Sequence, residues 1–424
     1  MKCKCVIIGG GAAGLMAAGA AAEKGAEVLI IEKNKYLGRK LRITGKGRCN
    51  VTNNCDRDAF FENIPVNPRF LYSAYSAFDK DDTMNFFESL GVPLKTERGN
   101  RVFPVSDKAD DIAAAFERVI SEKKITVKKG NAENIKTENG KITGVTVGGK
   151  FISADSVIIA TGGRSYPATG SDGSGYTMAE SLGHTVVQLK PSLVPIVSEE
   201  KYCCDMMGLS LKNVKVTLFD TVTKKKIYSE LGEMLFTHFG VSGPLILSAS
   251  SHIRNLERGR FKLFIDLKPG LDEKKLDSRI SRDFAESPNR EIGNVLRKLL
   301  PAKIIPPVTE LSGIPADKKV NQISRGERIK LMETLKNFPV TVRAFRPIDE
   351  AIITSGGVST SEINPKTMES KLVKGLYFAG EIIDVDAYTG GFNLQIAFST
   401  GYAAGVNAAE QKGNLHSWKK KTLL

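Results

Sequence analysis

Apolar positions near the start of the chain fall into two unbroken runs separated by an alanine-rich stretch. Residues 5–8 are continuously apolar, which is typical of a parallel strand buried on both faces. Residues 12–24 predict a helix, with Gly25 in the place of a C-terminal cap. Residues 28–31 predict a second strand, which ends at Glu32. This βαβ order predicts an α/β domain.

The pattern changes twice further along the chain. Residues 81–90 and 108–122 predict helices, and residues 125–127, 142–147, 151–153 and 156–160 predict strands. From about residue 191 the pattern becomes typical of antiparallel strands, because apolar and polar residues alternate over 214–219 and 261–265. A charged stretch over 271–336 follows and is predicted to be largely helical. Near residue 340 the α/β pattern resumes, and the last helix is expected over about 393–410. We therefore predict one domain built from two parts of the chain, residues 1–190 and 340–424, with a second domain inserted at residues 191–339. The inserted domain is expected to be barrel-like or sandwich-like at first and helical from about residue 271.

The apolar N-terminal run also has some features of a signal peptide. Three glycines interrupt it at residues 9–11, and a second strand follows its helix directly. No stretch reaches the roughly 18 apolar residues that a membrane span needs. We therefore expect the run to be part of the fold, with no membrane insertion and a cytoplasmic location.

The charge balance adds little to this picture. The 424 residues include 61 Lys+Arg against 47 Asp+Glu, a net charge of +14, but the basic residues are scattered apart from the runs 224–226 and 419–421. Without an RNA-binding signature, we expect a preference for anionic ligands rather than for nucleic acid. Six cysteines and four histidines show no disulfide framework and no zinc spacing, so a reducing compartment and no metal are expected.

A glycine motif of the form GxGxxG lies between the first strand and the first helix. Gly9 permits the tight turn, Gly11 lets a pyrophosphate approach the backbone, and Gly14 lets the helix pack closely on the sheet. Ala13 lies in the first helical turn, whose free N–H groups favour phosphate. Glu32 ends the second strand where a ribose diol would be bound. Together these features predict dinucleotide binding.

Two further segments favour FAD over NAD. A basic, glycine-rich loop at residues 38–53 suits a long cofactor whose pyrophosphate and ribityl chain extend along it; its candidate contacts are Arg39, Lys40, Thr44, Gly45, Gly47 and Arg48. Near the C-terminus, Gly380 and Glu381 follow an apolar strand, and Gly391 precedes a helix whose N-terminus can face the flavin pyrimidine edge. The sequence therefore predicts one flavin site built from both ends of the chain.

In these segments and several others, the chain resembles the YhiN/BaiN-type flavoproteins of bacteria. The resemblance rests on GGGAAG (9–14), LGRKLRITGKGRCNVTN (37–53), ATGG (160–163), GSDGSGYTMAESLGH (170–184), LFTHFGVSGP (235–244) and YFAGEIIDVDAYTGGFNLQIAFSTG (377–401). It implies a Rossmann-like FAD-binding domain of the glutathione-reductase and fumarate-reductase type, with an inserted β-rich and helical domain. It also implies FAD contacts at Gly14, Glu32, Lys33, Lys40, Gly45, Arg48, Ala132, Thr161, Gly162, Glu381, Asn393 and Leu394.

The activity that this resemblance implies is reduction of conjugated enones in 3-oxo bile acids. One relative is associated with amine oxidation. Flavins carry hydride chemistry, so an enone reductase also needs a group that stabilises the enolate and a proton donor. The candidate catalytic residues are Arg48, His238 and Tyr388. Many relatives have Tyr where Phe392 stands, so no proton transfer is assigned to Phe392.

Three functions therefore stay open from the sequence. The first is a FAD-dependent reductase of a conjugated small molecule; because no second GxGxxG is present, NAD(P)H would bind only transiently as electron donor. The second is a flavin amine oxidase that passes electrons to oxygen. The third is an RNA-associated flavoprotein, motivated by the net charge of +14. The sequence does not predict an oligomeric state.

Overall fold

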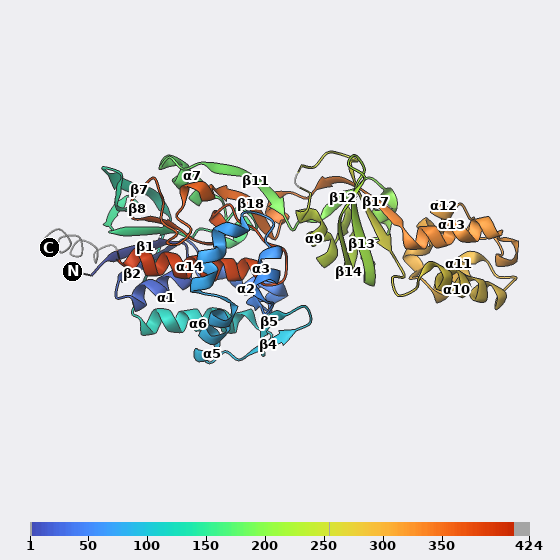
Figure 1. The fold of residues 1–424 in the computed structure, drawn as a ribbon, viewed down its shortest axis with the longest axis horizontal. Coiled ribbons are helices and arrows are strands. Elements are labelled where there is room, and N and C mark those ends of the chain that lie inside the picture. Colours follow the sequence, from blue (N-terminus) through green and yellow to red (C-terminus); the bar gives the residue numbers. More distant parts are fainter. Residues whose placement is uncertain (1, 254, 411–424) are drawn as a thin grey trace, which may run out of the picture. The chain divides into compact units, whose positions relative to one another are not determined.

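The computed structural model describes residues 2–253 and 255–410, which divide into two compact units (Figure 1). Unit 1 combines residues up to Pro191 with those from Ile352 onward, and unit 2 comprises Ser192–Ala351. The basic run 419–421 lies outside the described residues. Each unit has its own apolar core.

A five-stranded parallel sheet with the order β19-β10-β1-β2-β6 forms the centre of unit 1. The central strand β1 pairs with β10 on one side and with β2 on the other, and its apolar residues are buried. The bounds are β1 (Lys4–Ile8), β2 (Glu27–Glu32), β6 (Thr126–Lys129), β10 (Ser156–Ile159) and β19 (Leu376–Phe378). The predicted α/β Rossmann-like class is confirmed, and the sheet joins strands from both ends of the chain.

Helices α1 (Ala12–Glu23) and α14 (Phe392–Ala409) pack against each other at glycine positions. A Cβ at Gly401 would overlap the carbonyl oxygen of Ala13, and a Cβ at Gly405 would overlap that of Ala17. Larger side chains at these two positions would force the helices apart. The contact therefore brings the C-terminal helix onto the helix that follows the first glycine motif.

Smaller elements surround this core. The structure differs from the predicted loop at 38–53, because this segment contains α2 (Arg39–Gly47), whose helical geometry breaks at Thr44–Lys46. The other strands of unit 1 outside the five-stranded sheet form two three-stranded sheets, β3-β5-β4 and β7-β8-β9, and the pair β11-β18. Their bounds are β3 (Thr52–Asn53), β4 (Leu94–Glu97), β5 (Arg101–Pro104), β7 (Ala132–Glu138), β8 (Lys141–Val147), β9 (Lys150–Ser153), β11 (Val186–Ser192) and β18 (Ile353–Val358); the helices are α3 (Arg57–Glu62), α4 (Tyr72–Ala77), α5 (Lys80–Ser89), α6 (Ala109–Glu122) and α7 (Ser174–Ser181).

Unit 2 begins with a closed antiparallel barrel in the order β12-β15-β14-β13-β16-β17. Its strands are β12 (Ile196–Ser198), β13 (Ser210–Asp220), β14 (Lys225–Thr237), β15 (Gly240–Ser242), β16 (Phe261–Asp266) and β17 (Phe338–Phe345), with helices α8 (Lys201–Asp205) and α9 (Pro244–Ser251). The unit continues past the expected boundary at residue 339, because β17 pairs with both β16 and β12 and closes the barrel.

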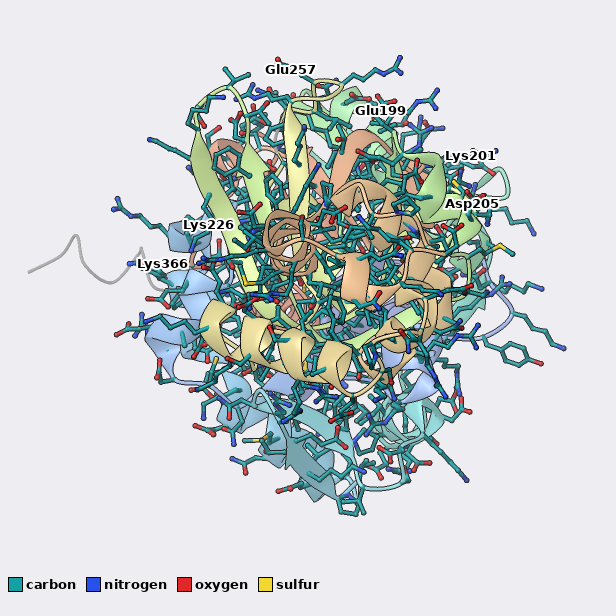
Figure 2. The ribbon with its side chains drawn as sticks, turned by 90° about the vertical axis from the view of Figure 1, so that its right-hand side faces the viewer. Glu199, Lys201, Asp205, Lys226, Glu257 and Lys366 are labelled. Carbon is teal, nitrogen blue, oxygen red and sulfur yellow. The ribbon has the colours of Figure 1, made fainter. Side chains whose placement is uncertain are left out.

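The helical part of unit 2 is inserted between β16 and β17. It contains α10 (Glu273–Ala285), α11 (Ile292–Val295), α12 (Ile305–Ser312) and α13 (Arg325–Lys336). Side-chain caps fix two of the helix starts: Asp272 accepts from the backbone N–H of Lys275, and Ser324 forms a capping box with Glu327. Figure 2 shows the ribbon with its side chains, in the colours of Figure 1.

No helix within the described residues is long and apolar enough to cross a membrane.

A buried histidine links the loop after α7 to the segment around β19. The neutral His184 ring donates from Nδ1 to Glu362 Oε2 at 3.1 Å and accepts at Nε2 from the Ser370 hydroxyl at 2.8 Å. Burial lowers the pKa of His184, and the nearby Glu362 only partly opposes this effect. The folded chain therefore holds this ring neutral at a pH where an unfolded chain begins to protonate it.

Because the folded pKa of His184 is depressed, its contribution to stability is present above its ordinary pKa of about 6.5 and lost as the pH falls below that value. We predict that His184→Gln lowers the stability of the protein at pH 7.5 by about 1–3 kcal/mol, since buried hydrogen bonds are lost. The thermal midpoints of the two proteins should converge as the pH falls toward 5. A difference in midpoint that stays constant across this range would contradict the assignment.

Candidate functional site

The loops that follow β1, β2, β10 and β19 meet at one edge of the parallel sheet, because parallel strands share the edge at which they end. The backbone N–H of Gly9 donates to Ile31 O at 2.9 Å, and that of Gly38 donates to Gly10 O at 2.8 Å. The backbone N–H of Ala379 donates to Ile159 O at 3.1 Å. This edge is where open α/β sheets bind their ligands.

The N-terminus of α1 opens onto this edge without a protein cap. Gly11 is its N-cap residue and offers no side-chain hydrogen bond, and the first turn contains no acidic residue. A Cβ built on Gly11 would meet nothing within 4 Å, whereas one on Gly14 would overlap the carbonyl oxygen of Gly9. Gly14 is thus needed for packing and Gly11 leaves open space, which together suit a phosphate at a helix N-terminus.

Glu32 is buried at the end of β2, and both of its carboxylate oxygens accept hydrogen bonds. Oε2 accepts from the Gly10 backbone N–H at 2.6 Å, and Oε1 accepts from the backbone N–H of Asn34 at 2.7 Å. The neighbouring Lys33 ammonium forms an ion pair with Asp172 at 2.6 Å. Ala132 is buried at the start of β7, two residues after Gly130, whose N–H donates to Glu32 O. These contacts hold the Glu32 carboxylate at the end of β2.

The break in α2 gives the basic segment its shape. Thr44 is extended, and Gly45 and Lys46 have left-handed backbone, with φ of 57° and 59°. The Thr44 hydroxyl donates to Leu41 O at 2.7 Å, and Gly47, with φ of 84°, has open space where a Cβ would stand. Arg39 lies nearer the start of the helix, where it donates to Asn34 Oδ1 at 3.3 Å. Short residues thus leave room along this segment between its basic side chains.

A lysine and a glutamate join the two halves of the site. Lys40 Nζ lies 2.8 Å from Glu381 Oε2 and 2.7 Å from the Ser165 hydroxyl. Glu381 Oε1 accepts from the Thr354 backbone N–H at 2.9 Å. Gly380, just before Glu381, lies so close to Ala13 that a Cβ built on Gly380 would be 2.7 Å from the Ala13 Cβ. Residues distant in sequence are therefore held together at this edge.

Arg48 is engaged with partners that the sequence did not suggest. Its guanidinium donates to Glu97 at 2.5 Å and to Asp107 at 2.6 Å, and it lies over the Phe103 ring at 4.1 Å. The next residue, Cys49, is fully buried, and burial raises the pKa of its thiol to about 12. A thiol with such a pKa stays protonated near neutral pH, so Cys49 is not a thiolate nucleophile.

The N-terminus of α14 is the second uncapped helix start. Gly391 has φ of 100° and no side-chain cap, and a Cβ there would overlap the Thr52 carbonyl group. The Asn393 side chain closes the preceding loop, because it accepts from the Ala387 N–H at 3.0 Å and donates to Ala387 O at 2.8 Å. The Tyr388 backbone N–H donates to Asn63 O at 3.0 Å, and Leu394 is half-buried in the first turn. The loop that carries Tyr388 is thereby fixed.

A buried polar network supports this helix start, and the sequence reasoning missed it. Gln395 Oε1 accepts from the hydroxyls of Thr52 at 2.7 Å and Thr83 at 2.8 Å, while Nε2 donates to Phe78 O at 3.1 Å. Gln395 is fully buried. The available signal was a glutamine in a largely apolar stretch of the helix, because a buried polar side chain requires partners.

Two buried polar atoms in the predicted cofactor segments have no partner among the described residues: Thr161 Oγ1 and Asn50 Oδ1. Thr161 follows β10, and Gly162 beside it has φ of 74°. A buried hydroxyl without a hydrogen bond costs free energy that a ligand can recover. With two open helix starts and the Glu32 carboxylate, these atoms make the site a fit for a dinucleotide such as FAD.

His238 lies in unit 2, in the turn between β14 and β15, whereas Arg48 and Tyr388 lie in unit 1. Its ring contacts Phe239 edge-on at 4.9 Å. Glu350 is nearby in the same unit, and its hydrogen bond to Arg346 lowers the pKa of its carboxyl. The structure therefore brings Arg48 and Tyr388 into one unit and places His238 in the other. No group of histidine, cysteine and acidic side chains suited to a metal occurs in the described part of the chain.

Comparison with known proteins places the chain in a family. The model of the HI0933-like protein Rossmann domain matches residues 3–407. A 3-dehydro-bile acid delta(4,6)-reductase of Clostridium scindens is 32% identical over 96% of this chain and 98% of its own length. Ribosomal RNA dihydrouridine synthases of Escherichia coli and Haemophilus influenzae are 30% and 31% identical, each over 96% of this chain and 98% of the relative.

We predict that Glu32→Ala weakens FAD binding about tenfold or more, because charge-assisted hydrogen bonds at this position contribute about 1.5–3 kcal/mol each. Titration of the apoprotein with FAD, followed by flavin fluorescence, measures the dissociation constant. Glu27→Ala is the matched control, since Glu27 is exposed at the opposite end of β2. Equal affinity in the parent and Glu32→Ala would show that the ribose does not bind there.

Thr161→Val should separate cofactor binding from stability. We expect the apoprotein of this variant to melt at the same or a higher temperature, because a buried hydroxyl without a partner is removed. Its affinity for FAD should fall about tenfold. In the control Thr309→Val the buried hydroxyl donates to Ile305 O in the parent, so its loss should lower the melting temperature. A lower apoprotein melting temperature in Thr161→Val would contradict the assignment.

Proposed function

Since the chain belongs to the HI0933-like family of Rossmann-domain proteins, we propose that this FAD-dependent oxidoreductase reduces a carbon–carbon double bond conjugated to a carbonyl group. The observation that carries the proposal is the match, over 96% of the chain, to relatives named for two substrates. One name denotes reduction of a bile acid enone, and the other denotes saturation of uridine. In both, the double bond that is reduced is conjugated to a carbonyl group.

The helix starts supply the electrostatics that this chemistry needs. When bound and reduced by NAD(P)H, the FAD would supply the hydride that adds to the β-carbon of the substrate. The open N-terminus of α1 would hold the pyrophosphate, and Glu32 would accept hydrogen bonds from the ribose. The open N-terminus of α14 would favour the negative charge that grows on the pyrimidine edge during reduction.

The proton for the α-carbon requires a separate donor, and we assign it to the Tyr388 hydroxyl. Its loop is closed by Asn393 and tied to Asn63, so the side chain projects from a fixed backbone. Arg48 is held by Glu97 and Asp107, which favours a role in shaping the loop over a role in proton transfer. His238 stays a candidate from the other unit.

Within this reaction class, uridine in RNA is the substrate we propose to test first. Two of the named relatives are ribosomal RNA dihydrouridine synthases, and this similarity reverses the sequence-based expectation of anionic ligands rather than nucleic acid. The net charge of +14 is compatible with a polyanionic substrate. A 3-oxo bile acid enone is the second candidate, supported by the relative at 32% identity. NAD(P)H is the proposed transient electron donor, and amine oxidation with oxygen is the alternative outcome.

Stopped-flow spectroscopy of the holoprotein under anaerobic conditions tests the proposal. We predict that NADH or NADPH bleaches the flavin bands, and that either protein-free ribosomal RNA or a 3-oxo-4-ene bile acid then restores them. Tyr388→Phe should slow the restoring step at least tenfold while bleaching continues at the parental rate, because only the proton donor is lost. Bleaching by amines in place of nicotinamides would replace this proposal with an amine oxidase.

A further inference from the structure

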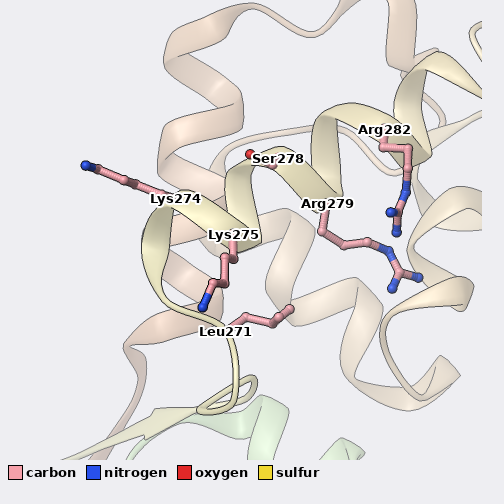
Figure 3. A pocket seen from close by; sticks show the side chains of 6 residues that line it. All are labelled: Leu271, Lys274, Lys275, Ser278, Arg279 and Arg282. Carbon is pink, nitrogen blue, oxygen red and sulfur yellow. The ribbon is translucent and has the colours of Figure 1, made fainter.

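Helix α10 presents a row of cations along one face of unit 2. A hollow of about 410 Å³ lies against this face and is lined by Leu271, Lys274, Lys275, Ser278, Arg279 and Arg282. Figure 3 shows the guanidinium groups of Arg279 and Arg282 extending to the same side of the helix. Four of the six lining residues are basic and none is acidic, so the hollow suits an anion.

A second hollow of about 380 Å³ extends the first one. Leu271 lines both, and the second adds Lys212 at the start of β13 and Lys268 in the turn before α10. Burial and the nearby Arg279 lower the pKa of Lys268. An anion in the adjoining hollows would relieve the repulsion between these like charges. The two hollows therefore form one basic surface, which we call the α10 surface.

Acidic residues on α10 do not neutralise this surface completely. Asp277 pairs with Arg328 of α13, and Glu286 pairs with Lys298. The buried Asp283 binds Arg279 at 2.9 Å, and the exposed Asp272 lies 3.3 Å from Lys275. Lys212, Lys274 and Arg282 form no ion pair within residues 2–253 and 255–410. These three cations are therefore available to a ligand.

The spacing of the cations distinguishes between small and extended anions. From Lys274 to Arg282 the helix advances about 12 Å, at roughly 1.5 Å per residue. One small anion cannot contact charges spread over that distance. A nucleic acid strand presents a phosphate at each nucleotide, so several phosphates can lie along the helix.

We propose that the α10 surface binds the phosphate backbone of RNA and so holds a substrate strand on this protein. The inference rests on the proposed reduction of uridine in RNA, and it adds the site that would bind the rest of the strand. A surface of this kind positions the strand without reading its sequence, because phosphates are the same at every nucleotide. Selection of the reacting base is left to the flavin site.

The test uses the holoprotein with Lys274→Gln, Lys275→Gln and Arg282→Gln combined. Arg279 is kept, because its removal would leave Asp283 buried without a partner. The matched control combines Lys24→Gln, Lys123→Gln and Lys150→Gln, three exposed lysines of unit 1. Fluorescence anisotropy of a labelled oligouridine measures binding at several salt concentrations.

We expect the α10 variant to bind oligouridine at least tenfold more weakly near 0.1 M salt, with the salt dependence reduced by about 2 in the log–log slope. The control variant should bind as the parent does. Both variants should reduce a small enone at the parental rate, because α10 lies outside the flavin site. Equal loss of binding in both variants, or none in the α10 variant, would overturn the proposal.

Two further outcomes separate this inference from the proposed function. A parent that reduces a small enone but does not bind oligouridine overturns the α10 surface and leaves the reductase standing. A parent that binds oligouridine through α10 but reduces no enone supports the surface and rejects the reductase. Vesicles containing anionic lipid are added as a competitor, and binding of the α10 surface to vesicles in preference to oligouridine would assign it to a membrane and overturn the RNA proposal.

Discussion

The structure depends on the close contact between the first and last helices of unit 1. Gly401 and Gly405 on α14 lie against the carbonyl groups of Ala13 and Ala17 on α1, where no side chain can fit. Together with the pairing of β19 with β10 and the Lys40–Glu381 ion pair, this contact brings residues near the start of the chain and residues near its end to the same edge of the sheet. The insertion of 160 residues as unit 2 leaves the contact intact, because both helices belong to unit 1.

Two features of the protein leave hydrogen-bonding groups without a protein partner, which costs free energy unless a ligand binds to them. Both α1 and α14 begin at glycines that provide no side-chain cap, so N–H groups in their first turns remain available. The buried Thr161 hydroxyl likewise has no partner in the described chain. By contrast, Gln395 satisfies its hydrogen bonds with Thr52, Thr83 and Phe78, which fixes the start of α14. A rigid support therefore surrounds groups that a bound cofactor can satisfy.

Local motifs predicted more of this architecture than of its chemistry. The parallel strands, the helix after Gly11 and the helix after Gly391 follow from short-range patterns, and the structure confirms these elements. The partners of Arg48 were not predictable, because Glu97 and Asp107 lie in other elements that only the fold brings close. The assignment of each residue to cofactor binding or catalysis stays a prediction.

Identification of the cofactor that copurifies with the protein tests the central claim most directly. Heat-released cofactor can be separated by chromatography and compared with FAD and FMN standards, and its amount compared with that of the protein. The site described here predicts FAD at one molecule per chain, because Glu32 and the α1 N-terminus are placed for the ribose and pyrophosphate of a dinucleotide. FMN, or a colourless protein that cannot be reconstituted with FAD, would contradict the account.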